Sequence, residues 1–353
     1  MPDWLLIFVP VAIALEYLAP EHHLLIFIAS AIAILPLASW LGRATEQLAD
    51  RSGEGIGGLL NATFGNAAEL IIALAALRAG LHDVVKATIV GSIVGNILLV
   101  LGAAMLAGGV RYREQSFNAS GALAQATMLT LAAIALIVPA AYSALVGEFQ
   151  PGGKEALSIS ISLVLLCVYV LFLRFSLLTH SSYFLGPESL SSAEHSNPWP
   201  LQKSLAVLTA ATVAIAWLSE ILVGAIEPSA HELGLSNIFV GVFVVAVLGN
   251  AAEHSTAITA AMKNRMDLSL SIAIGSSVQV ALFVAPLLVL ASLVLGPRPM
   301  DLLFGKGLVL AVLVAVLITG QVAGNGRSDW LKGIQLLAVY LILALAFLLT
   351  PQV

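Results

Sequence analysis

Long apolar runs recur along the whole chain and are separated by short polar breaks. A helix needs about 20 apolar residues to cross the hydrocarbon layer of a bilayer, which is about 30 Å thick. The runs are continuous rather than alternating, so they predict membrane-spanning helices and not the strands of a β-barrel. The expected spans are about eleven in number and cover approximately residues 4–18, 22–42, 55–78, 84–107, 118–145, 156–178, 204–224, 236–262, 268–295, 303–323 and 330–350.

An internal repeat relates the two halves of the chain. A shift of 184 residues brings GNAAE at 65–69 onto GNAAE at 249–253 without a gap, and GS at 91–92 onto GS at 275–276. One register therefore serves two successive helices in each half, which predicts a duplicated chain. Five expected helices separate equivalent points, so the two copies cross the membrane in opposite directions, as the inverted repeats of secondary transporters do.

The predicted fold class follows from this duplication. We expect an all-α integral membrane protein with an extra N-terminal helix over residues 1–20, a first five-helix repeat over 21–180 (helices 2–6), and a second over 204–353 (helices 7–11). The polar segment 181–203, rich in Ser, Pro and Glu, has the composition of a linker between them.

Basic residues predict the orientation of the chain. With a cytoplasmic N-terminus, most Lys and Arg residues fall on the inner side, among them Arg43, Arg51, Lys263 and Arg265. An odd number of helices then places the C-terminus outside. We expect a multi-pass protein of the plasma membrane of a prokaryote.

Composition supports the membrane assignment and narrows the partners. Of the 353 residues, 59% are hydrophobic and only 10% are charged, whereas soluble domains carry about 25% charged residues. The formal net charge of −5 is small and scattered. It predicts neither a nucleic-acid surface nor a polybasic lipid anchor.

Each repeat places an Asn and a Glu three residues apart inside an apolar run: Asn66 with Glu69, and Asn250 with Glu253. Residues three or four apart share one face of a helix. Small residues surround the polar pair on that face and would let another helix approach closely. The small residues expected as backbone or packing positions near the site are Gly65, Gly249, Ala62 and Ala246.

Two glutamates near the bilayer midplane require neutralisation. A single ionised carboxylate there costs at least about 2.5–3.5 kcal/mol, and two that face each other also repel. Either both are protonated or a cation lies between them, and these two states are the halves of an exchange cycle. Oxygen ligands suit Ca²⁺ or Mn²⁺ better than Zn²⁺ or Cu²⁺. The alternative is a pair of protonated glutamates that only bridges two helices.

The helices after each motif add further candidate ligands. Ser92 and Ser276 correspond in the repeat register, whereas Asn96 and Gln279 differ by one position yet follow their serines by about one turn. We expect all four to line the same cavity, with hydrogen bonding between helices as the alternative for Asn96 and Gln279.

His254 follows Glu253 and belongs to a neighbouring helical face. It is a candidate proton relay, with a packed, hydrogen-bonded histidine as the alternative. The segment EHSTA is not HExxH, and no GxSxG, P-loop or Rossmann fingerprint occurs in a suitable context. We therefore expect a protein that is not an enzyme and has no resident cofactor.

The segments GNAAELIIALAAL and GNAAEHSTAITAAMKNRMDLSLSIAIGSSVQVALFVAPLLVL resemble the paired c-1 and c-2 motifs of the CAX family, the Ca²⁺/H⁺ antiporters of the cation/Ca²⁺ exchanger superfamily. The resemblance covers the eleven-helix layout. It implies that Glu69 and Glu253 bind the cation and accept protons. It also implies that further site residues lie beside or near them, namely Asn66, Asn250, Ser92, Ser276 and Gln279.

Within that superfamily, the Na⁺/Ca²⁺ exchangers carry a motif similar to GTSxPE at these positions. Here Ala68 and Ala252 replace the proline, so fewer sodium ligands remain and protons are the expected counter-ion. The leading hypothesis is a secondary antiporter that moves Ca²⁺, or alternatively Mn²⁺, against H⁺ by alternating access. A passive cation channel is a second class, and an intramembrane enzyme lacks an assembled nucleophile or metal triad.

Overall fold

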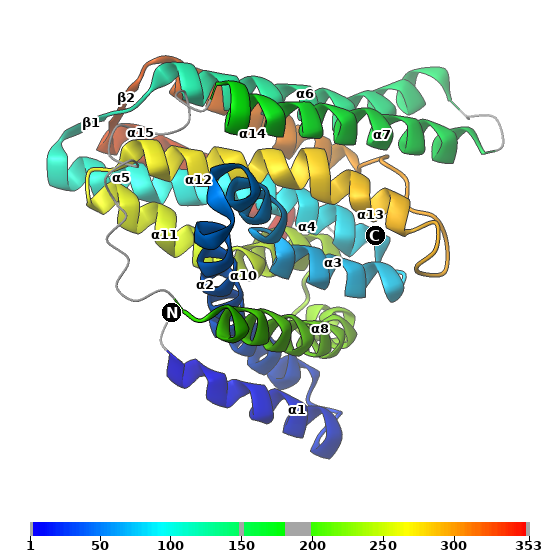
Figure 1. Cartoon of the computed structure of the whole chain (residues 1–353). Helices are drawn as coiled ribbons and strands as arrows, with labels where there is room; N and C mark the ends of the chain where they lie inside the picture. The colour runs from blue at the N-terminus through cyan, green and yellow to red at the C-terminus, as the bar shows by residue number, and fades with distance from the viewer. Residues whose placement is uncertain (1–2, 148–151, 181–198, 351–353) are drawn as a thin grey trace. The chain divides into compact units, whose positions relative to one another are not determined.

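A computed structural model describes residues 3–147, 152–180 and 199–350, and these residues are almost entirely helical (Figure 1). The elements of the first half are η1 (Asp3–Ile7, a 3₁₀ helix), α1 (Phe8–Leu18), α2 (His23–Phe64), α3 (Ala67–Arg78), α4 (His82–Val94), η2 (Gly95–Val100), α5 (Leu101–Tyr112), β1 (Glu114–Ser116), α6 (Ala119–Val146), α7 (Gly153–Arg174) and η3 (Phe175–Thr179). Those of the second half are α8 (Leu201–Glu232), α9 (Asn237–Phe239), η5 (Val240–Val245), α10 (Ala246–Gly249), α11 (Ala251–Met262), α12 (Met266–Gln279), η6 (Val280–Val284), α13 (Ala285–Ala291), α14 (Lys306–Gly324), β2 (Arg327–Asp329) and α15 (Trp330–Leu348). The elements η2, η3, η5 and η6 are π-helical.

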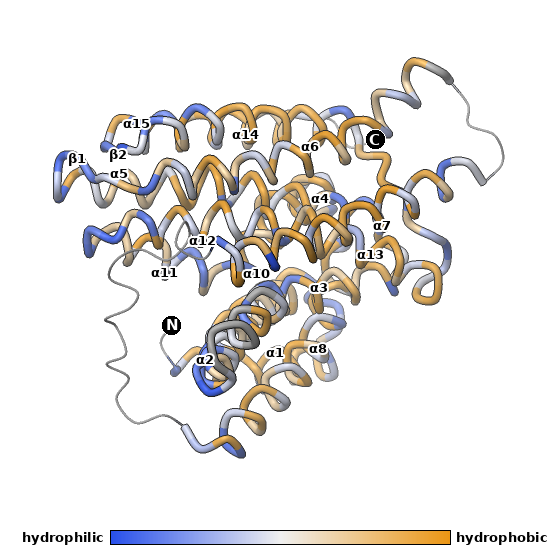
Figure 2. The backbone as a smooth tube through the Cα atoms, turned by 45° about the horizontal axis from the view of Figure 1, so that its top comes forward, coloured by the Kyte–Doolittle hydropathy of each residue, from blue (hydrophilic) through white to orange (hydrophobic). Residues whose placement is uncertain are grey.

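The chain is a multi-pass membrane protein. Within the described residues, eight helices are long and apolar enough to span a bilayer, and a ninth span is formed if the pair bent by 64° at Asn250 counts as one. Figure 2 shows long orange, apolar stretches in most of the helices, whereas α2 also has blue, hydrophilic parts. Helices α1 and α3 have 11 and 12 residues, fewer than the about 20 that a complete span requires. The expected number of eleven spans stays a prediction.

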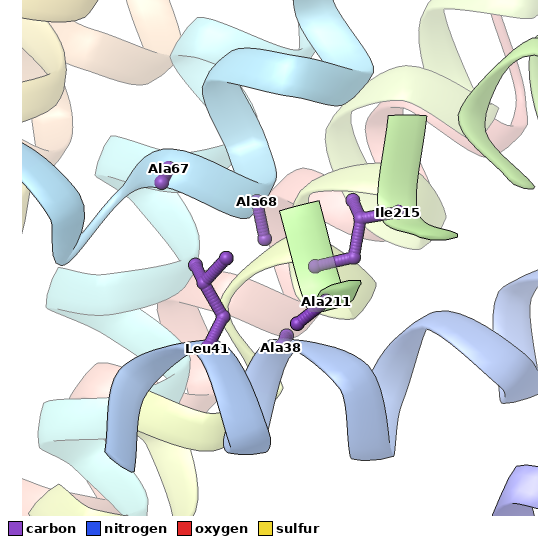
Figure 3. Packing of buried hydrophobic residues seen from close by; sticks show 6 residues of the cluster. All are labelled: Ala38, Leu41, Ala67, Ala68, Ala211 and Ile215. Carbon is purple, nitrogen blue, oxygen red and sulfur yellow. The ribbon is translucent and has the colours of Figure 1, made fainter. Parts of the chain in front are cut away.

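One compact unit contains residues 3–88 and 199–252. In this first unit α8 packs along α2, α1 packs against α2, and α3 packs against α8. Small side chains at the contact let the helices approach closely. The cluster in Figure 3 consists of Ala38 and Leu41 from α2, Ala67 and Ala68 from α3, and Ala211 and Ile215 from α8.

The second unit contains residues 89–147, 152–180 and 253–349. Here α5 packs against α15, α6 against α14 and α12, and α13 against α7. Glycines allow the close contact of α5 with the last helix: a Cβ at Gly109 would lie 2.2 Å from the backbone nitrogen of Trp330, and one at Gly333 would lie 2.4 Å from that of Leu106. Strands β1 and β2 pair antiparallel, with Gln115 opposite Ser328.

Helix α2 differs from the sequence prediction. Separate helices were expected at 22–42 and 55–78, but α2 is continuous for 42 residues, from His23 to Phe64. The polar segment between the two expected helices is rich in Ala, Leu, Glu, Gln and Arg, which are strong helix formers, so the helix continues where the apolar run stops. The predicted repeat boundaries stay predictions, and most of the predicted linker lies outside the described residues.

Candidate functional site

Both GNAAE motifs interrupt their helices at the asparagine. Asn66 has φ −99° and ψ 21°, and Asn250 has φ −100° and ψ 3°, so the backbone makes the same break twice. These angles lie in the sparsely occupied bridge region between helix and strand conformations, where many active-site residues are found. The prediction of one continuous helical face through each motif is therefore wrong: the glutamate lies in the first turn of a new helix, α3 or α11.

Two of the four π-helical segments, η2 and η6, also correspond in the repeat register. Adding 184 to the bounds of η2 gives 279–284, which overlaps η6 at Val280–Val284. A π-helical turn inserts an extra residue into a helix and frequently occurs at functional sites. Both segments begin within one turn of the candidate ligands Ser92 and Ser276, so each copy carries a break before its glutamate and a π-helical turn after its serine.

In the first unit, Glu69 from the first motif contacts the second motif directly. The Asn250 amide nitrogen Nδ2 donates a hydrogen bond to Glu69 Oε1 and a second, at 3.0 Å, to the carbonyl oxygen of Ala246. Glu69 and Asn250 are only 4% and 2% exposed. Ala246 is thus a backbone contact of Asn250, and residues far apart in sequence form one buried polar group.

Gly249 completes this contact by leaving space for the glutamate. A Cβ on Gly249 would lie 2.8 Å from Glu69 Cγ, closer than real Cβ atoms approach. The glycine of the second motif is therefore needed for the side chain of the first. Gly249 is thus in close contact with Glu69, whereas Gly65 is exposed, and the predicted roles of both glycines stay predictions.

In the second unit, Glu253 lies beside the helix that follows it. The Ser276 hydroxyl donates a hydrogen bond to the Glu253 carboxylate, and Ser276 is buried. The other oxygen, Oε2, is buried and has no hydrogen-bond partner among the described residues. A buried carboxylate oxygen of this kind needs a proton or a cation.

His254 points to a different partner from Glu253. Its Nε2 donates a hydrogen bond of 3.0 Å to Asn96 Oδ1, and both side chains are buried. Sequence reasoning missed this pair. The repeat register offered a signal, because the equivalents of His254 and Asn96 are Leu70 and Val280, so both polar residues of the pair are replaced by apolar ones in the other copy.

The other predicted residues occupy compatible positions in their units. Asn66 and Ser92 are buried in the first and second unit respectively, and Gln279 is half-buried in the second. Ala62 lies in the last turn of α2, and its side chain is outside the described part of the structure. The donor atoms of the set are carboxylate, amide and hydroxyl oxygens, which are the ligands that hard cations prefer.

Comparison with known proteins identifies the family. The sequence pattern of the family described as sodium/calcium exchanger protein matches residues 22–178 and 203–349. The chain belongs to the sodium/calcium exchanger protein family. Within it, the chain is 45% identical over 361 residues to a Ca²⁺/H⁺ antiporter of Aphanothece halophytica, covering 99% of this chain and 96% of that one.

Two further similarities agree with this assignment. The Ca²⁺/H⁺ antiporter ChaA of Bacillus subtilis is 42% identical over 326 residues and covers 92% of each chain. The solved structure of native YfkE superimposes with a TM-score of 0.84 at 38% identity, covering 98% of each chain. These similarities confirm the resemblance to Ca²⁺/H⁺ antiporters that the two motifs indicated.

Proposed function

We propose that this chain is a secondary antiporter that exchanges Ca²⁺ for H⁺ across the membrane. The relatives named Ca²⁺/H⁺ antiporter support this activity, since two of them cover more than nine-tenths of the chain at 42% and 45% identity. The observation that carries the proposal is the contact of Glu69 with Gly249 and Asn250, because it joins the two motifs at a buried carboxylate.

In the proposed mechanism Glu69 and Glu253 bind the cation and protons in turn. Two ionised carboxylates carry two negative charges, which one Ca²⁺ or two protons neutralise. Because the empty, doubly charged site is costly in a membrane, release of Ca²⁺ is coupled to protonation. Alternating access exposes this site first to one side and then to the other. Mn²⁺ prefers similar oxygen ligands and is the alternative transported ion.

The proposed roles of the asparagines follow from the repeat. Asn250 donates to Glu69, so its amide orients that carboxylate. Asn66 holds the equivalent position in the first copy, at a shift of 184 residues. For Glu253, the buried oxygen Oε2, which has no hydrogen-bond partner among the described residues, is the proposed ligand for the cation or a proton.

The proposed site contains a second group of side chains around the glutamates. Ser276 binds the Glu253 carboxylate, and Ser92 holds the equivalent position in the first copy. Asn96 and Gln279 complete the oxygen ligands. His254 stays a candidate proton relay, with its Nε2 held by Asn96.

We further propose that the chain contains two inverted five-helix repeats preceded by one extra helix, with the N-terminus in the cytoplasm and the C-terminus outside a prokaryotic plasma membrane. The family pattern matches twice, over residues 22–178 and 203–349. The two asparagine breaks share one register of 184 residues, and so do the π-helical segments η2 and η6. Both findings support duplication.

Substitution of the two glutamates tests the shared site. We expect Glu69→Gln and Glu253→Gln each to reduce Ca²⁺ transport by at least about 100-fold, because glutamine keeps the size of the side chain but removes its charge and its proton. Transport is measured as Ca²⁺ uptake by proteoliposomes, and folding is checked by the elution of the purified protein in size-exclusion chromatography.

Glu220→Gln is the matched control, since Glu220 is exposed and pairs with Arg78 at 3.3 Å. It should transport Ca²⁺ as the wild type does. Near-wild-type uptake by a folded Glu69→Gln or Glu253→Gln protein would contradict the two-glutamate site.

A further inference from the structure

The helices that carry the two glutamates end in the same turn. At the end of α3, Gly80 N donates to Leu77 O at 3.0 Å and Leu81 N to Ala76 O at 2.9 Å, with Gly80 at φ 79°. At the end of α11, Asn264 N donates to Ala261 O at 3.0 Å and Arg265 N to Ala260 O at 2.9 Å, with Asn264 at φ 61°. Each atom pair of one turn has its equivalent in the other at a shift of 184 residues.

The two turns differ in the residue at the left-handed position. Glycine adopts a positive φ without strain, and asparagine is one of the few other residues that tolerate it. Gly80 has no side chain, whereas Asn264 Oδ1 accepts a hydrogen bond of 2.9 Å from Gln115 Nε2. The same Nε2 donates to the carbonyl oxygen of Ala261, also at 2.9 Å.

The surroundings of Gln115 are built to hold its side chain. Gln115 is 2% exposed, and its backbone is fixed in β1 opposite Ser328 of β2. Gly108 of α5 makes room for it, because a Cβ there would lie 1.9 Å from Gln115 Oε1. The space at Gly108, the pairing of β1 with β2, and the left-handed conformation of Asn264 together fix the position of the Gln115 side-chain amide.

Two further hydrogen bonds attach α11 to the same stretch of chain. Tyr112 Oη donates to the carbonyl oxygen of Met262 at 3.1 Å, next to the Gln115 contacts. Near the start of α11, His254 Nε2 lies 3.0 Å from Asn96 Oδ1, to which it is hydrogen-bonded. The segment from η2 to β1 therefore holds α11 both beside Glu253 and at its end.

We propose that Gln115 is a positioning residue that latches the end of α11 through Asn264 and Ala261, and so fixes the helix from which Glu253 binds the cation. The latch has no counterpart on α3, where the equivalent residue is glycine. The inference rests on the proposed exchange function for its effect on transport, but the latch itself is measurable without transport.

Two variants weaken the latch without removing a candidate ligand. Gln115→Met keeps the length of the side chain and loses both hydrogen bonds of the latch. Asn264→Gly restores the residue that the first copy uses in the same turn and loses the hydrogen bond to Asn264, while the one to the Ala261 carbonyl oxygen is kept. We expect each to raise the KM for Ca²⁺ by about threefold to tenfold, the range of one neutral hydrogen bond. The maximal rate should change by less than about twofold. The double variant should be no worse than Gln115→Met, because Gln115→Met already removes the hydrogen bond that Asn264→Gly removes.

Amide hydrogen exchange of the purified protein separates the latch from the transport function. In both variants, the amide hydrogens of residues 251–262 should exchange faster than in the wild type, and those of residues 67–78 should exchange at the wild-type rate. Gly80→Asn is the matched control, since it places the same side chain in the turn that has no glutamine partner, and it should leave both the KM and the exchange of α11 unchanged.

Wild-type exchange rates over residues 251–262 in Asn264→Gly, together with a wild-type KM, would overturn the latch even if Gln115→Met did not fold. Absence of Ca²⁺ uptake by the wild type would instead refute the proposed function, and the exchange data would still decide whether the latch exists.

Discussion

At the scale of single residues, the surroundings of Glu69 define the proposed chemistry. One oxygen of its carboxylate accepts a hydrogen bond from Asn250, and its side-chain Cγ lies where a larger residue at 249 would clash. The side chain is therefore oriented by two residues of the other motif. A cation ligand held in this way is ready to bind before the ion arrives, which reduces the cost of binding.

Gly249→Ala should abolish this orientation. The added Cβ would lie 2.8 Å from Glu69 Cγ, so either Glu69 or the backbone at the break must move. We expect Ca²⁺ uptake by proteoliposomes to fall at least about tenfold with the protein still folded. Gly224→Ala is the matched control, because a Cβ at Gly224 meets nothing within 4 Å. Equal uptake by the two variants would show that the Gly249 contact does not matter.

The sequence indicated the identity of these residues but not their partners. The repeat register identified Asn66, Glu69, Asn250 and Glu253, because an amide and a carboxylate recur within apolar runs. Which amide binds which carboxylate depends on how distant helices pack, and a single sequence does not record that. The pairing of Asn96 with His254 was missed for the same reason.

At the scale of secondary-structure elements, the decisive feature is the break before each glutamate. Apolar periodicity runs straight through both motifs, so it predicted continuous helices. The break instead places Glu69 and Glu253 in the first turn of α3 and α11, where the backbone N–H groups of a helix are not bonded within the helix. Gly-Asn at both breaks is the local signal, since both residues favour turns.

A side-chain cap marks the start of α6. Asn118 caps α6, since its side chain accepts hydrogen bonds from Ser120 N at 3.0 Å and Gly121 N at 3.3 Å. We expect Asn118→Ala to lower the free energy of unfolding by about 1 kcal/mol, seen as a lower midpoint of thermal unfolding in detergent. Ser160→Ala is a suitable control, because the exposed Ser160 hydroxyl binds only a carbonyl of its own helix. An unchanged midpoint for Asn118→Ala would mean that the cap does not stabilise α6.

At the scale of the whole molecule, hydropathy and the repeat predicted most of the architecture. The multi-pass membrane class and the family follow from apolar runs and from the two GNAAE motifs, and both are confirmed. The number of spans is harder to predict, because α2 continues through a polar segment and α3 is short. Helix-forming residues extend a helix beyond the membrane, so hydropathy does not determine where it ends.

The proposed exchange also explains why so apolar a chain retains buried polar residues. Glu69, Asn66, Asn250, Ser92 and Ser276 are all nearly inaccessible to solvent. Intramembrane polar residues destabilise a chain unless a partner or an ion satisfies them. The proposed exchange would satisfy them with a cation or protons, and their recurrence in both halves is what a duplicated site predicts.

Ca²⁺ uptake by proteoliposomes under an imposed pH gradient tests the central claim most directly. With wild-type protein, uptake should require the gradient, reverse when the gradient is reversed, and move protons in the opposite direction to Ca²⁺. Dissipating the gradient with a protonophore should stop the uptake. Ca²⁺ entry at the same rate with and without the gradient would contradict antiport and would instead indicate a passive channel.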